Sequence, residues 1–269
     1  MGQLLRHIFK PKNITMEKKT KLTAFCSPKG GIGKSTYTIL AASYLHYIKG
    51  LSVMIVDADY SQPSAFKQRL REEKVVNETE YYRNLMTEQY RRTGQKIYPV
   101  IKAEAKYALE EYETYRHSDD RHLDVAFFDL PGTMNSPGVM ETITSLDHVF
   151  VPIAADPLVM DSTLSLMSVL DESVFGRPDV RLSGAHMFWT KVDKRERNIY
   201  YDQYDELIDS YGLSRLAAHI PERVHFKREI YPFEAPVYRS TLFAPCDSFI
   251  ADSCIGALME EICSVLNLG

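Results

Sequence analysis

The sequence predicts an α/β fold with a doubly wound, mostly parallel sheet flanked by helices. Short apolar runs lie at 22–26, 53–57 and 123–129, and such runs are typical of strands that are buried on both faces. Helical patterns alternate with these runs along the chain. A glycine-rich stretch stands between the first run and the first helix, at the corner where a phosphate-binding loop lies. We therefore expect ligand-binding groups at the carboxyl ends of the strands.

The composition is that of an ordinary globular protein. The 269 residues are 45% hydrophobic and 25% charged, which suits one large α/β domain. A formal net charge of −4 argues against a strongly basic nucleic-acid protein but leaves room for a local basic patch. The four cysteines lack CxxC spacing, which favours reduced thiols in a cytoplasmic protein over a metal site. Because no long apolar run is present, we expect no stable membrane insertion.

The first twenty residues read as an N-terminal extension. Apolar residues at 4, 5, 8 and 9 are flanked by basic ones, which would form a short amphipathic turn. A membrane or partner contact is one interpretation. We favour a frayed extension, because so short a segment buries too little apolar area for stable anchoring.

The glycine-rich stretch has the chemistry of a phosphate-binding loop. Its glycines let the backbone turn tightly and point N–H groups at one anion, and the following helix adds its own free amides. Lys34 would reach the β- and γ-phosphates, and the hydroxyl of Ser35 would bind Mg²⁺. Pro28 stands where the generic pattern has glycine, and a second lysine precedes the glycine pair. The predicted nucleotide-binding residues of the loop are Lys29, Gly30, Gly31, Ile32, Gly33, Lys34, Ser35 and Thr36.

Two further strands end in carboxylates. Asp57 closes the run 53–57 and Asp59 follows it, and Asp129 closes the run 123–129. Such carboxylates often only cap the next helix, but at the sheet edge that carries a phosphate loop we favour metal binding and catalysis. Asp129 is predicted to hold the magnesium shell.

Residues 64–117 are polar, rich in tyrosine and mostly helical by pattern, with breaks near Gly94 and Pro99. We interpret 66–122 as an inserted helical region at the edge of the fold. Tyrosine is favoured at interfaces, but a solvated helical face is the stronger explanation of the pattern.

The rest of the chain continues the alternation. A strand is predicted at 146–153, a helix opened by Asp156 and Pro157 that runs to about 175, a strand at 180–189, and helices at 194–211 and 246–267.

The string KGGxGK[ST] resembles the deviant Walker A loop of the ParA/MinD family of ATPases. The resemblance runs from about residue 21 to the carboxyl end and leaves out much of 66–122. It implies a single ATPase domain over 21–269. In that family the extra lysine crosses a dimer interface, which would make Lys29 act on the partner's nucleotide. Asp59 would orient the attacking water, Asp57 would support the magnesium shell, and the turn after Asp129 resembles the switch loop that responds to the γ-phosphate. The family's Pro-Gln pair after these aspartates is rearranged here.

The resemblance also implies base and DNA contacts. Thr190 opens a segment similar to the base-contacting loop. Residues 219–227 resemble the family's segment after the last core strand, where a proline, here Pro221, packs near the adenine. Basic residues in these two regions form a DNA-binding surface in ParA relatives; here they are Lys194, Arg195, Arg197, Arg223 and Lys227. The final helix has an acidic polar face, so a MinD-type C-terminal lipid anchor is not expected.

These patterns predict an ATPase switch with ATP and Mg²⁺ as cofactors. Lys29, Lys34 and Asp59 would be catalytic, and Ser35, Asp57 and Asp129 would hold the metal. The resemblance implies a homodimer in the ATP state, a stimulating protein partner, and a role in segregation or transfer of plasmid-like or mobile-element DNA. The alternatives are a MinD-like positioning ATPase at a membrane or on a protein, a small-molecule kinase or ligase, and a protein that binds nucleotide without hydrolysing it.

Overall fold

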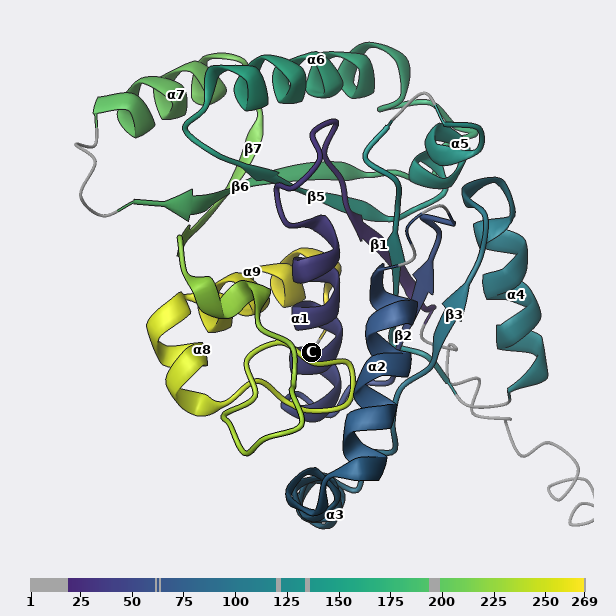
Figure 1. The fold of residues 1–269 in the computed structure, drawn as a ribbon. Helices are drawn as coiled ribbons and strands as arrows, with labels where there is room; N and C mark the ends of the chain where they lie inside the picture. The colour runs from purple at the N-terminus through teal and green to yellow at the C-terminus, as the bar shows by residue number, and fades with distance from the viewer. Residues whose placement is uncertain are drawn as a thin grey trace, which may run out of the picture.

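The computed structural model describes residues 19–60, 62, 64–119, 122–133, 136–193 and 199–268. These residues form a sheet of seven strands in the order β3-β2-β4-β1-β5-β6-β7, and every pairing is parallel. The predicted α/β class is therefore confirmed (Figure 1). The strands are β1 (Lys21–Phe25), β2 (Val53–Asp57), β3 (Val100–Lys102), β4 (Val125–Asp129), β5 (His148–Ile153), β6 (Gly184–Val192) and β7 (Ser214–Pro221).

Helices cover both faces of this sheet (Figure 1). The longer ones are α1 (Lys34–Tyr47), α2 (Ser64–Glu78), α3 (Glu80–Thr93), α4 (Ala108–Ser118), α6 (Pro157–Ser173), α7 (Ile199–Ser210) and α9 (Ile255–Leu266). Short ones are α5 (Val139–Thr144), α8 (Asp247–Ser253) and the 3-10 turns η1 (Ala105–Tyr107) and η2 (Val224–Lys227). As predicted, α6 opens on Asp156, whose side chain accepts a hydrogen bond from Val159 N at 3.0 Å, with Pro157 in the first turn.

The core has two layers because successive strand residues point to opposite faces. On one face, residues such as Val56, Phe128 and Met187 pack against α4, α5, α6 and α7. On the other, Phe25 and Phe127 pack against α1 and α9. The strands are buried on both faces, which is why they appear in the sequence as apolar runs without alternation.

Strand order places the ends of three strands side by side. β1 lies between β4 and β5, and β4 lies between β1 and β2. In this register Asp57 pairs with Asp129 across β2 and β4. The chain crosses outward in opposite directions from β1 and from β4, so a crevice opens at their carboxyl ends. The phosphate loop and all the predicted acidic groups are brought to this edge.

Four expectations about elements need correction. The region 66–122 is not wholly helical, because Val100–Lys102 form β3 and pair with β2 at the sheet edge. The strand predicted at 180–189 begins at Gly184, since residues 177–180 form a turn in which Val180 N donates to the Arg177 carbonyl. The helix predicted at 246–267 is broken into α8 and α9 by Cys254, whose φ is +57°. His219, Ile220 and Pro221 belong to β7, whereas we expected them after the last core strand.

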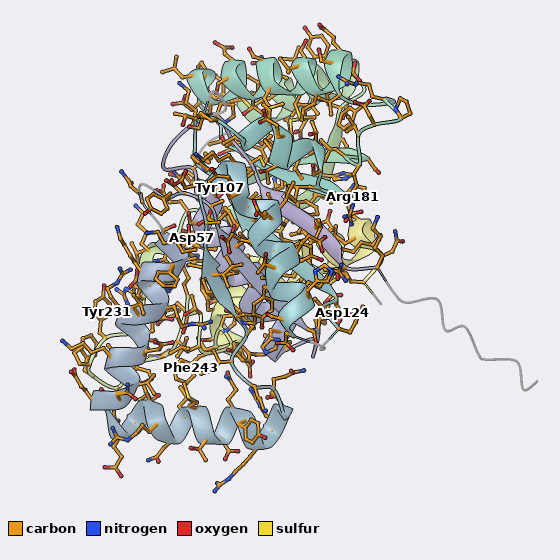
Figure 2. All side chains as sticks on the ribbon, turned by 90° about the vertical axis from the view of Figure 1, so that its right-hand side faces the viewer. Asp57, Tyr107, Asp124, Arg181, Tyr231 and Phe243 are labelled. Carbon is orange, nitrogen blue, oxygen red and sulfur yellow. The ribbon has the colours of Figure 1, made fainter. Side chains whose placement is uncertain are left out.

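A long segment without helix or strand, residues 228–246, joins η2 to α8 and packs on α2 and α3. Its Val237, Leu242 and Phe243 share a small core with Val76 and Tyr82 (Figure 2, which labels Tyr231 and Phe243 beside these helices). The helical region after β2 and this late segment therefore form one unit beside α1.

Within the described residues, no helix combines the length and the apolarity that crossing a membrane requires.

Candidate nucleotide-binding site

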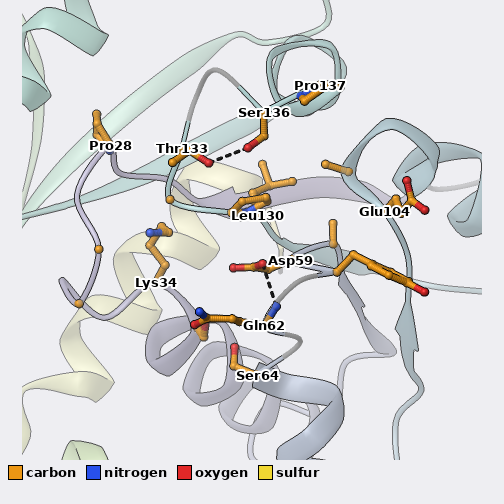
Figure 3. Close-up of a pocket in the computed structure, with 18 of the residues that line it drawn as sticks. Pro28, Lys34, Asp59, Gln62, Ser64, Glu104, Leu130, Thr133, Ser136 and Pro137 are labelled. Carbon is orange, nitrogen blue, oxygen red and sulfur yellow. Dashed lines mark hydrogen bonds between the residues drawn. The ribbon is translucent and has the colours of Figure 1, made fainter.

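A cavity of about 920 Å³ lies at the carboxyl edge of the sheet (Figure 3). The phosphate loop, the turns after β2 and β4, and η1 form its walls. Of the predicted site residues, it is lined by Gly30, Gly31, Gly33, Lys34, Ser35, Thr36 and Asp59. Its size is in the range that small-molecule and cofactor sites occupy.

The glycines of the loop meet a geometric need at two positions. Gly31 and Gly33 have φ of +72° and +110°, which lies in the region that side chains disfavour. A Cβ on Gly33 would also come within 2.9 Å of the Tyr37 ring. Tyr37 is fixed below the loop, since its hydroxyl is hydrogen-bonded to Thr190 and its ring packs on Phe188. Only glycine therefore allows the loop to turn into α1 here.

Lys34 occupies the centre of the loop. Its ammonium donates to the carbonyl of Lys29 at 3.3 Å, and it lies so close to the turn after β4 that a Cβ on Gly132 would come within 3.0 Å of it. Burial lowers the pKa of Lys34, and the charge of Asp129 opposes that effect. A buried cation beside a ring of backbone amides is suited to bind phosphate oxygens.

Asp129 connects the phosphate loop to the start of α2. It accepts hydrogen bonds from the Ser35 hydroxyl at 3.0 Å and from the Ser64 hydroxyl at 3.1 Å. Burial raises the pKa of Asp129, while these hydroxyls and Lys34 lower it. Ser35 and Asp129 therefore stand together, as a shared magnesium shell requires.

Asp57 lies behind this pair and is fully buried. One of its oxygens, Oδ2, accepts from the Phe66 amide at 2.9 Å, whereas Oδ1 has no hydrogen-bond partner among the described residues. Burial and the charge of Asp129 raise the pKa of Asp57. An orphaned buried carboxylate oxygen near a serine hydroxyl and a second carboxylate is a donor set that fits Mg²⁺, which prefers oxygen ligands and retains waters.

Asp59 faces the cavity instead of the core (Figure 3). Its Oδ1 accepts from the Gln62 amide at 3.2 Å, so the turn after β2 holds the carboxylate in place. Asp59 also contributes to the field at Lys34. The two aspartates at the end of β2 thus differ: Asp57 is buried in the sheet beside Asp129, and Asp59 lies on the open side, facing the cavity.

The other predicted residues lie farther from the cavity. Lys29 and Ile32 are not among its lining residues, and Ile32 is buried. Thr190 is buried and bonded to Tyr37, and Pro221 is buried at the end of β7, so base contact by either stays a prediction. Arg223 and Lys227 are exposed near η2. Lys194, Arg195 and Arg197 lie outside the described residues, as does most of the N-terminal extension.

Sequence reasoning missed several groups at the site. Ser64 was not noticed because a serine at a helix start normally signals only a cap. Glu104 and Lys106 line the far wall because β3 brings η1 to the cavity, and β3 itself was not predicted. Arg239 comes from the segment 228–246 and donates to the Thr36 hydroxyl at 3.0 Å. The two residues are 203 positions apart, so no local sequence pattern predicts this contact.

Comparison with known proteins agrees with this geometry. The CobQ/CobB/MinD/ParA nucleotide binding domain family matches residues 23–232. A chromosome-partitioning ATPase, Soj, of Thermus thermophilus is 25% identical over 232 residues, which cover 83% of this chain and 88% of that protein.

Solved structures share the fold at lower identity. A MinD cell division protein of Aquifex aeolicus has a TM-score of 0.57 at 13% identity and covers 93% of this chain and 98% of its own. A putative plasmid partition protein of Borrelia burgdorferi, bound to AMPPNP, has a TM-score of 0.55 at 16% identity and covers 92% and 98%. A cobyrinic acid a,c-diamide synthase of Mycobacterium smegmatis, with bound ADP and magnesium, has a TM-score of 0.51 at 20% identity and covers 76% and 87%. Since the family match spans most of the chain, this protein belongs to the CobQ/CobB/MinD/ParA family of nucleotide-binding ATPase domains.

Proposed function

We propose that this protein is a Mg²⁺-dependent ATPase switch that hydrolyses ATP to ADP and phosphate and dimerises in its ATP state. Its use would be the segregation or transfer of plasmid-like or mobile-element DNA in the cytoplasm. The partition roles of the relatives named above favour this use, and the site geometry favours the chemistry.

One observation carries the proposal most directly. Ser35 lines the cavity and donates to Asp129, which pairs with Asp57 at the rear, while Lys34 and Asp59 face the open cavity in front. The rear group offers oxygen ligands for Mg²⁺. In front, Lys34 would neutralise charge on the transferred phosphoryl group and Asp59 would align water, which are the tasks that phosphoryl transfer demands of a protein.

Dimerisation is proposed from Lys29. Among the described residues of one chain, Lys29 does not line the cavity, although its neighbour Gly30 does. A lysine so placed would act on a second copy's nucleotide, as the family resemblance implies. One chain alone would then lack a charge that the transition state needs.

The discriminating experiment is phosphate release with Mg²⁺ and ATP, measured alone, with nonspecific duplex DNA, and with anionic lipid vesicles. We expect basal release that DNA stimulates. Stimulation by lipid alone would support the MinD-like alternative, and no release under any condition would leave a protein that binds nucleotide without hydrolysing it.

The DNA contact is tested separately with Arg195→Glu/Arg197→Glu. Because phosphate contacts release counterions, DNA affinity in ATP should fall steeply with salt and should drop by more than tenfold in this variant. The control is Asp161→Lys/Asp171→Lys, which replaces two exposed charges on α6 and shifts the net charge in the opposite direction. An affinity within twofold of the parent would remove DNA binding through this cluster.

A small-molecule kinase or ligase is the second candidate that a specific observation favours. The cavity continues past Lys34 and Asp59 to Glu104, Lys106 and Pro137, which leaves space on the side where a phosphoryl acceptor would lie. Stimulation of ADP formation by a mixture of small carboxylic acids, in the absence of DNA, would favour this candidate.

A further inference from the structure

Lys191 has two unusual features that the proposed chemistry does not use. Its φ is +56°, one of three positive values at non-glycine residues in the described part of the chain. Its side-chain ammonium donates to the carbonyl of Gly31 at 2.9 Å, across 160 positions. A side chain in the left-handed region costs energy, so such a residue persists where its surroundings require it.

Gly31 lies at the turn of the phosphate loop, and it lines the cavity. In a trans peptide the carbonyl of one residue and the N–H of the next point in opposite directions. When Lys191 holds the Gly31 carbonyl on one side of the loop, the N–H of Ile32 is turned to the other side. A loop that binds phosphate needs its N–H groups turned toward the anion before it arrives.

The neighbouring residue holds the same loop from below. Thr190 is bonded to the Tyr37 hydroxyl, and the Tyr37 ring fills the space under Gly33. The end of β6 is itself fixed, since Trp189 donates to Asp205 of α7 at 2.8 Å. Two consecutive residues at the end of one strand therefore fix the phosphate loop at Gly31 and beneath Gly33.

We propose that Lys191 is a positioning residue that orients the Gly31–Ile32 peptide of the phosphate loop for phosphate binding, and does not read the base. The proposal deepens the nucleotide-binding function proposed above and rests on it. Lys191 would thus act on the phosphate loop, although the segment 190–193 to which it belongs resembles a base-contacting loop.

Inorganic tripolyphosphate separates the two roles because it has phosphates and no base. Binding of Mg²⁺–tripolyphosphate and of Mg²⁺–ATP is measured by calorimetry for the parent and for Lys191→Met, which keeps the length and apolar stem of the side chain. We expect both affinities to fall by about the same factor, roughly tenfold, which corresponds to about 1.4 kcal/mol. Lys191→Arg, which retains a donor and the charge, should recover most of the loss. Lys74→Met, an exposed lysine on α2, is the matched control and should bind both ligands as the parent does.

Two outcomes would overturn the proposal. If ATP affinity falls while tripolyphosphate affinity stays within twofold, Lys191 contacts the base. If both affinities fall at 0.05 M NaCl but the difference disappears at 0.5 M, Lys191 acts only through its charge, because salt screens distant exposed charges. Lys191→Gly relieves the backbone strain and should lose tripolyphosphate affinity as the methionine variant does, even where its thermal stability rises. Failure of the parent to bind either ligand would refute the nucleotide-binding function itself.

Discussion

The buried carboxylate of Glu72 gives the sharpest test of how the segment 228–246 is held. Glu72 is 1% exposed and accepts three hydrogen bonds: from Thr241 N at 2.8 Å, from the Thr241 hydroxyl at 2.6 Å, and from Gln68 Nε2 at 2.8 Å. Arg69 donates two hydrogen bonds of 2.9 Å to the same threonine, from Nε to its hydroxyl and from Nη2 to its carbonyl. Burial is the main cause that raises the pKa of Glu72, and the hydrogen bonds oppose it.

Glu72→Leu would leave the Thr241 N–H, the Thr241 hydroxyl and the Gln68 amide without this acceptor. Each buried group left unpaired costs about 1–3 kcal/mol. Removing the carboxylate also removes its own desolvation cost, which offsets part of this loss. We therefore expect the free energy of unfolding to fall by about 3–5 kcal/mol. Glu72→Gln keeps one acceptor oxygen and should lose about 1 kcal/mol.

Urea unfolding followed by circular dichroism measures both losses. Glu73→Leu, on the exposed side of the same helix turn, is the control and should change stability by less than about 0.5 kcal/mol. A Glu72→Leu variant within about 1 kcal/mol of the parent would show that the network contributes little and that the loop is held by its apolar residues alone.

Three further predictions concern the site and the sheet. Lys34→Met should weaken ATP binding on the order of 100-fold, because a buried ammonium that would contact the phosphates is lost. Lys29→Met should keep ATP binding within a few-fold of the parent but lose hydrolysis and ATP-dependent dimerisation. Equal loss of binding in the two variants would show that Lys29 acts only in its own chain. Asp59→Ala should lower phosphate release by roughly 10²–10⁴-fold and trap an ATP-bound dimer in size-exclusion chromatography; a trapped dimer for Asp57→Ala, with normal hydrolysis by Asp59→Ala, would reverse the two roles. Burial, together with His148, lowers the pKa of His186 from 6.5 to about 4. The folded protein therefore binds a proton at His186 less readily than the unfolded chain does. The free energy of unfolding should fall by about 1–2 kcal/mol as the pH drops from 6.5 to about 4, a modest loss because solvent screens the partly exposed ring. Urea unfolding at pH 7.5 and 4.5 should show a smaller fall for His186→Asn than for the exposed control His117→Asn.

The sequence was informative where structure is dictated locally. Strands buried on both faces are visible as apolar runs, and the glycines of the phosphate loop are required by φ values that side chains disfavour. Parallel strands bring their carboxyl ends to one edge, so Asp57 and Asp129 could be assigned to one site before their pairing in β2 and β4 was known. The placement of the phosphate loop between β1 and α1 follows from the same rule.

Short or irregular elements were not visible in this way. β3 has only three residues, and Pro99 directly before it suggested a break in a helix instead of a strand. The interruption at Cys254 carries neither glycine nor proline, so the apolar spacing of 246–267 gave no sign of it. Both errors arise because neighbours in space decide these conformations: β2 supplies the partner for β3, and at Gly256 an added Cβ would meet Ile250 and Tyr44.

Buried polar groups account for the most important feature that was missed. Glu72, Arg69 and Gln89 look like ordinary surface residues of a charged helix, yet each is buried and bonded to residues 241–244. Their partners lie more than 150 positions away, beyond the reach of any helical periodicity. The same segment carries Arg239, whose guanidinium donates both to Thr36 of the phosphate loop and to Glu229. The region 66–122, which the sequence indicates as an inserted helical region at the edge of the fold, is thus linked through this segment to the phosphate loop. Arg71 of α2 closes this connection by binding Glu229 through two hydrogen bonds of 3.0 and 2.8 Å. α2 is therefore linked to the start of α1 in two ways: through Arg71, Glu229 and Arg239, and through Ser64, whose hydroxyl donates to Asp129.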